Sequence, residues 1–74
     1  MTIQKSKSTI FLADMIERSP YPVYVILDDK KIDLTENRHL LNLFRKYWNL
    51  EDVTEVTLET ENTAICLLEK AANL

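Results

Sequence analysis

The sequence predicts a single α+β domain, residues 1–74: a four-stranded, mostly antiparallel sheet from two hairpins, with two helices on one face. Two segments alternate apolar and polar residues about a central turn, and two others place apolar residues at helical spacing. Their order along the chain is α-β-β-α-β-β. Since a lone hairpin cannot bury its apolar face, we expect both hairpins to join one sheet beneath the helices.

The first helix is expected over residues 8–18. Ser8 is the expected N-cap, and Ser19-Pro20 should end the helix because the residue before a proline avoids helical backbone angles. Polar residues 1–7 and the tail 71–74 are expected to be frayed. The apolar residues of the helix recur with the spacing of one buried face, and they are Phe11, Leu12, Met15 and Ile16.

The first hairpin is expected over residues 23–34, with Asp29-Lys30 as its two-residue turn. The chain contains no glycine, so any position that needs a positive φ angle must be held by Asn or Asp. In the expected register the aliphatic residues Val23, Val25, Leu27, Ile32 and Leu34 share one face. The opposite face then holds Tyr24, Ile26, Lys31 and Asp33.

The second helix is expected over residues 35–48. Asp33 with Glu36 has the form of a capping box, and Asn49 can end the helix where a glycine often stands. One side of the helix is broadly apolar, with Leu40, Leu41, Leu43, Phe44, Tyr47 and Trp48. The other side carries a basic stripe of Arg38, Asn42, Arg45 and Lys46.

The second hairpin is expected over residues 53–70, with its turn at Glu61-Asn62. A slip of one residue would bury Glu55 and Glu59, so the register is well determined. Val56, Leu58, Ile65 and Leu67 then share the inner face. The outer face holds Glu55, Thr57, Glu59, Ala64, Cys66 and Leu68.

The composition predicts a cytoplasmic protein without a catalytic or metal site of its own. A secreted domain of 74 residues would usually need disulfides, and Cys66 is the only cysteine. No segment approaches the roughly 20 apolar residues that span a membrane. The absence of glycine removes phosphate-binding loops, and His39 with Cys66 falls short of a zinc site. We therefore predict no enzymatic activity, no metal and no cofactor.

The charge and the surplus of apolar residues predict that the partner is another protein. A net charge of −3 argues against a general nucleic-acid binder. The outer sheet face leaves apolar side chains that no helix covers, and aromatic residues are common at binding hot spots. The expected partner-binding residues are Glu55, Glu59, Glu61, Tyr24, Ile26, Leu68 and Trp48.

We therefore expect a non-enzymatic protein-binding module, an adaptor or inhibitor that occupies a partner's surface. Small acidic domains of this kind occur among phage and mobile-element proteins that block a host nuclease, polymerase or defence complex. This association concerns the class of protein and does not follow from particular residues. Pairing of the outer face, or of a sheet edge, across a two-fold axis would give a homodimer. The alternative is a small regulatory nucleic-acid-binding domain that uses Arg38, Asn42, Arg45 and Lys46. A structural subunit of a larger assembly is a third interpretation, which the sequence does not separate from the first.

Overall fold

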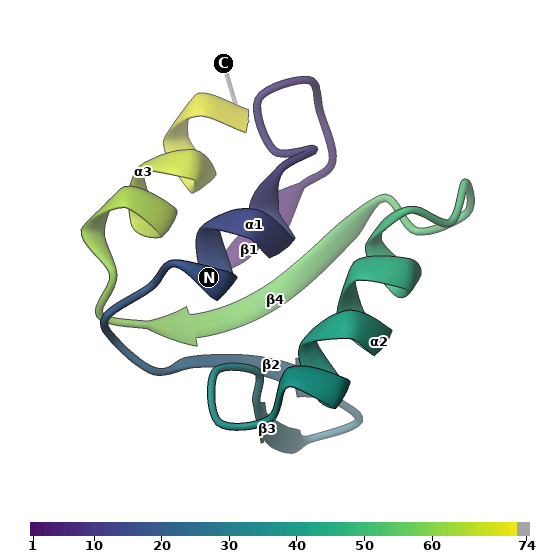
Figure 1. Ribbon diagram of the computed structural model, residues 1–74. Coiled ribbons are helices and arrows are strands. Elements are labelled where there is room, and N and C mark those ends of the chain that lie inside the picture. The colour runs from purple at the N-terminus through teal and green to yellow at the C-terminus, as the bar shows by residue number, and fades with distance from the viewer. Residues whose placement is uncertain (73–74) are drawn as a thin grey trace.

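The computed structural model describes residues 1–72, and it confirms the predicted class: an α+β domain with a four-stranded antiparallel sheet. A short N-terminal strand and a C-terminal helix occur in addition to the predicted elements (Figure 1). The elements are β1 (Thr2–Gln4), α1 (Leu12–Glu17), β2 (Val23–Leu27), β3 (Lys30–Asp33), α2 (Arg38–Trp48), β4 (Glu55–Thr60) and α3 (Thr63–Ala72). None of the helices between residues 1 and 72 is long and apolar enough to cross a membrane.

The strands lie in the order β1-β4-β2-β3, and each pairs antiparallel with its neighbour. It follows that β1 and β2 run in the same direction with β4 between them, and that β3 and β4 do so with β2 between them. Two β-α-β units are thus interleaved, and each provides a strand that fills the gap in the other. Neither unit can complete its part of the sheet alone.

The first hairpin has the predicted faces but a different turn. Asp28-Asp29 forms the turn, so that Leu27 pairs with Lys30. Both turn residues have positive φ angles, 49° and 65°. This is the feature of type I′ turns, which match the twist of a hairpin. The register moved by two residues, an even number, and every side chain therefore keeps its predicted face.

The predicted second hairpin is wrong in its C-terminal half. Val56 and Leu58 of β4 point inward as predicted, but Thr63–Ala72 forms the helix α3. Asn62 acts as its N-cap, because its Oδ1 accepts a hydrogen bond from the backbone N–H of Ile65 at 3.2 Å. The following residues are rich in Ala, Leu, Glu and Lys, which favour a helix.

The strand beside β4 is instead the N-terminal β1, so the expectation that residues 1–7 are frayed is also wrong. Ile3 lies opposite Val56 and is fully buried. The α-amino group of Met1 donates to the carbonyl oxygen of Leu58 at 2.8 Å, which ties the first residue to the sheet. At the other end, residues 71 and 72, also expected to be frayed, belong to α3. Residues 73–74 lie outside the described residues.

Both other helices are shorter than predicted. α1 begins at Leu12 without a side-chain cap, so Ser8 is not its N-cap, and Phe11 is exposed rather than buried. α2 begins at Arg38, because the side chain of Asn37 accepts hydrogen bonds from the first turn and caps the helix there.

The core lies between the inner face of the sheet and the helices (Figure 1). Trp48 stacks on Phe44, with ring centroids 6.2 Å apart. Its indole N–H donates to the carbonyl oxygen of Thr9 at 2.9 Å, which satisfies the polar atom of a buried ring. Ile16 of α1 and Ile65 of α3 join the same cluster, so helices from both ends of the chain cover one face.

Candidate protein-binding surface

In the part of the chain that the structure describes, all helices pack on the inner face of the sheet, and the outer face is uncovered. Alternate residues of each strand point outward. The outer face, as defined by the strand pairing, consists of Thr2, Gln4, Tyr24, Ile26, Lys31, Asp33, Glu55, Thr57 and Glu59. Carboxylates outnumber cations on this face, so it is acidic.

Tyr24, Lys31 and Glu59 form a cluster on the outer face, on three adjacent strands towards the β3 edge of the sheet. The ammonium group of Lys31 lies 3.2 Å from Oε1 of Glu59 and 4.3 Å from the centroid of the Tyr24 ring. It therefore makes an ion pair and a cation–π contact at once. Because the ion pair is well exposed to solvent, we expect it to contribute little to stability and to open at little cost when a partner arrives.

A hollow of about 420 Å³ lies at this cluster, lined by Pro22, Tyr24, Lys31, Glu59, Thr60 and Glu61. It brings together three residues of the predicted partner-binding set, Tyr24, Glu59 and Glu61. The hydroxyl of Thr60 donates to the carbonyl oxygen of Pro22 at 2.8 Å and holds one wall in place. An aromatic ring next to two carboxylates is complementary to a lysine or arginine side chain.

Two further predicted residues lie on the outer face but outside the hollow. Glu55 accepts a hydrogen bond from Nε2 of Gln4 at 2.8 Å, and Ile26 is half-buried. The predicted set omitted Gln4 because the N-terminus was expected to be frayed. It also omitted Lys31, although the hairpin pattern already placed this residue on the face of Tyr24. Glu59 comes close to Lys31 only because β4 lies next to β2 in the sheet, which the sequence pattern did not predict.

Two residues of the predicted partner-binding set lie elsewhere. Trp48 is 2% exposed within the core and is not accessible to a partner. Leu68 is on α3 and packs against the core rather than on the outer face. Ala64 and Cys66 also belong to α3. Among the described residues, Tyr24 and Ile26 are therefore the only large apolar side chains of the outer face, which is more polar than predicted.

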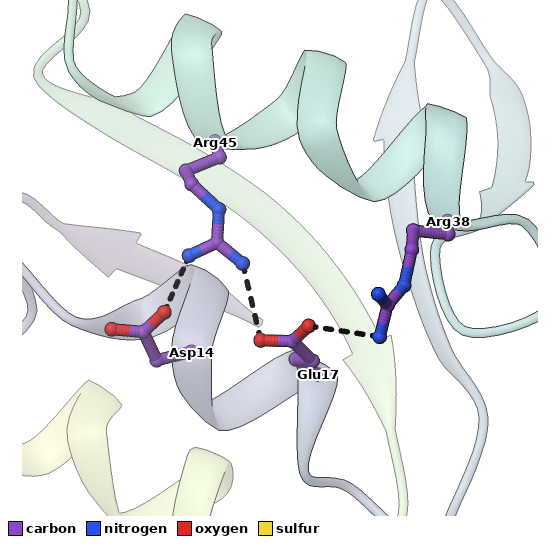
Figure 2. A network of polar contacts seen from close by, with 4 residues as sticks. All are labelled: Asp14, Glu17, Arg38 and Arg45. Atoms are coloured by element: carbon purple, nitrogen blue, oxygen red, sulfur yellow. Dashed lines mark hydrogen bonds and ion pairs between the residues drawn. The ribbon is translucent and has the colours of Figure 1, made fainter.

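Two of the four residues of the basic stripe predicted on α2, Arg38 and Arg45, contact carboxylates of α1 (Figure 2). Nη1 of Arg45 pairs with Asp14, and Nη2 of Arg45 lies 3.3 Å from Oε2 of Glu17. Nη2 of Arg38 lies 3.4 Å from the other oxygen of the same carboxylate.

The environment of Arg45 stabilises its charged form. The hydrogen bond to Asp14 raises the pKa of Arg45, and the negative charges of Asp14 and Glu17 add to this effect, against the opposing effect of partial burial. Two carboxylates thus face two guanidinium groups across the α1–α2 contact. Of the predicted stripe, Asn42 and Lys46 remain on the exposed side of α2.

The two soft metal ligands lie on different helices, His39 exposed on α2 and Cys66 half-buried on α3. The thiol of Cys66 lies 3.7 Å from the carbonyl oxygen of Thr60. Within the described residues, no group of three or more His, Cys, Asp or Glu side chains is arranged to hold a metal ion. The prediction that the protein uses no metal and has no enzymatic activity stays a prediction.

Comparison of the chain with protein-family models, with curated proteins and with solved structures finds no match. What the surface can bind therefore has to be inferred from its own residues.

Proposed function

We propose that this protein is a non-enzymatic protein-binding module that docks the acidic outer face of its sheet on a basic surface of another cytoplasmic protein. The observation that supports this proposal is the uncovered outer face, which is acidic and carries the cluster of Tyr24, Lys31 and Glu59. Binding there would make the protein an adaptor, or an inhibitor where the covered surface is one that the partner needs.

The spacing of the carboxylates supports a partner with several cations. Glu55 and Glu59 lie on the same face of β4, four residues and thus roughly 13 Å apart along the strand. Glu61 continues this row just beyond the end of the strand. A basic surface that binds nucleic-acid phosphates has a complementary charge pattern, and the module would block such a surface by occupying it.

A homodimer through the same face is less well supported than a foreign partner. Residues 64, 66 and 68 do not contribute apolar area to this face, because they belong to α3. A two-fold axis through the face would also bring Glu55 and Glu59 towards their own copies, and like charges oppose each other at an interface.

The nucleic-acid-binding alternative also has weaker support. Arg45 is paired with Asp14 and Glu17 of α1, so its charge is already compensated, and Arg38 makes one exposed ion pair with Glu17. The uncovered face of the sheet has the charge that phosphates avoid.

The test uses a fluorescent arginine-rich peptide as the basic probe and charge reversal as the perturbation. We expect Glu55→Lys with Glu59→Lys to weaken peptide binding about tenfold or more, measured by fluorescence anisotropy in low salt. The matched control reverses two exposed carboxylates in the turn after α2, Glu51→Lys with Asp52→Lys. This control has the same net charge and should bind within about twofold of the unmodified protein.

Equal weakening in both double variants would overturn the proposal, because net charge and not the outer face would then control binding. A salt-sensitive complex with an oligonucleotide that is lost in Arg38→Gln with Lys46→Gln would favour the nucleic-acid alternative instead.

A further inference from the structure

An apolar groove lies on the other side of the sheet, between α2 and the β2–β3 hairpin. Its volume is about 220 Å³. Leu27 and Ile32 line it from the hairpin, and Leu40, Leu43 and Tyr47 line it from α2. Every lining side chain is aliphatic or aromatic, in contrast to the hollow of the outer face.

The groove is open because the apolar side of α2 is wider than the sheet beneath it. Leu41, Phe44 and Trp48 fill the core. Leu40, Leu43 and Tyr47 follow the spacing i, i+3 and i+7 along the flank of the helix, beyond that buried stripe. Leu43 is 49% exposed, and Leu27 across the groove is 40% exposed. Two large aliphatic side chains on facing walls thus remain in contact with solvent.

The charges around the groove indicate which occupant fits. The sequence of α2 contains no Asp or Glu. Apart from Leu43, the exposed residues of α2 include His39 and Lys46. Among the described residues, Lys46 is in no ion pair, unlike Arg38 and Arg45. The hairpin rim is mixed, with Asp28 and Asp29 at the turn and Lys30 after it. The helix side of the groove therefore favours carboxylates.

A second copy of this chain that places its own α2 in the groove does not match this pattern. Packing α2 against its own copy across a two-fold axis would place two helices together that both carry cations and no carboxylates. Like charges across an interface oppose association.

We infer that the groove binds an amphipathic helix of a second partner protein, whose apolar stripe enters the groove and whose carboxylates face the α2 rim. This mode of recognition uses apolar anchors at i, i+3 or i+4, and i+7. The groove and the acidic face lie on opposite sides of the sheet, so both can be occupied together. The protein is then an adaptor with two surfaces of different chemistry.

The probe is a labelled helical peptide with Leu at i, i+3, i+4 and i+7 and Glu at the flanking positions. A matched peptide carries Lys in place of each Glu. Because the acidic outer face would also attract the Leu/Lys peptide, the two peptides are compared on Glu55→Gln with Glu59→Gln. We expect the Leu/Glu peptide to bind this variant at least about tenfold more tightly than the Leu/Lys peptide, measured by fluorescence anisotropy. Leu43→Asp should reduce binding of the Leu/Glu peptide by about tenfold or more, because it places a charge in the apolar wall.

The matched control is Leu67→Asp, because Leu67 is 63% exposed on α3 and is not among the residues that line the groove. It should leave the affinity within about twofold. Circular dichroism of both variants establishes that they are folded. Lys46→Glu provides a second variant, and it should shift the preference towards the Leu/Lys peptide.

Equal binding of the two peptides, or unchanged binding in Leu43→Asp, would overturn the inference. Self-association of the unmodified protein in sedimentation, abolished by Leu43→Asp, would also overturn it by assigning the groove to a second copy. The charge reversals at Glu55 and Glu59 should not weaken binding of the acidic peptide, so this test and that of the outer face can fail separately.

Discussion

The outer face of the sheet and the groove beside α2 differ in how closely their residues are connected to the core. On the outer face, Lys31 and Glu59 are exposed side chains that mainly contact each other and Tyr24. The walls of the groove continue directly into the core, since Val25 and Phe44, 2% and 5% exposed, also line it. Substitutions on the outer face can therefore change binding with little effect on the free energy of unfolding. In the groove, only substitutions of rim residues such as Leu43 can do so.

The largest expected effect comes from truncating one aromatic residue in each region. Phe44→Ala should lower the free energy of unfolding by about 3–5 kcal/mol, because it leaves a cavity in the core. Tyr24→Ala should cost about 1 kcal/mol or less, as a half-buried cross-strand contact. Urea denaturation followed by circular dichroism measures both values. Equal losses would mean that the outer face is part of the folding core, and the contrast between the two regions would not hold.

A smaller effect concerns Asp33, the residue of the outer face that does contribute to folding. Its Oδ1 accepts hydrogen bonds from the backbone N–H of Thr35 at 2.8 Å and from the hydroxyl of Thr35 at 2.6 Å. Partial burial acts to raise the pKa of Asp33, but the hydrogen bonds from Thr35 and from the backbone N–H of Glu36 prevail and leave it below its ordinary value.

A lowered pKa in the folded state means that the unfolded chain takes up the proton first as the pH falls. The stabilisation by Asp33 is thus complete above the unfolded pKa, near 4, and is lost as the pH falls through the lower folded value. We expect Asp33→Asn to be less stable than the unmodified protein at pH 7 and to lose less stability between pH 5 and 2. Urea midpoints across this range provide the measurement, and parallel curves for the two proteins would contradict it.

The smallest effect on stability, and the clearest separation of stability from binding, is expected at Lys31. Lys31→Gln should change the free energy of unfolding by less than about 0.5 kcal/mol, because the ion pair with Glu59 is well exposed. It should strengthen binding of the arginine-rich peptide, because Glu59 loses its internal counter-ion. Lys46→Gln is the control, since it should leave that peptide unaffected and weaken the Leu/Glu helical peptide. Weaker binding of the arginine-rich peptide to Lys31→Gln would show that the ammonium group itself contacts the partner.

The first hairpin shows how far local patterns could predict this fold. Alternation assigned Tyr24 and Lys31 to one face and Val25 and Ile32 to the other, as the structure has them. The turn was displaced because registers that differ by two residues bury the same face. The structure has the register in which two adjacent aspartates adopt positive φ angles.

The C-terminal half shows where local patterns were insufficient. Residues 64–68 form a continuous apolar run, which suits either a buried strand or a helix. Asn62 followed by helix-favouring residues is the local signal for α3, but Ile65 and Leu67 also fit the inward positions of a strand. The strand that pairs with β4 in place of the predicted one is Thr2–Gln4, which is too short for an alternating pattern to be recognised. It forms only by pairing with β4, which lies near the other end of the chain.

The sequence by itself determined which way each strand residue points, because a period of two leaves no other arrangement that keeps Glu55 and Glu59 out of the core. It therefore determined that one face of the sheet would be acidic. Only the tertiary structure decided which strands are neighbours. The position of β4 next to β2 brings Glu59 to Lys31, 28 residues away in the chain. The strand β1 occupies the place beside β4 that the predicted second hairpin assigned to residues of α3. These contacts depend on how separate elements share one core, which the pattern within any one segment does not encode.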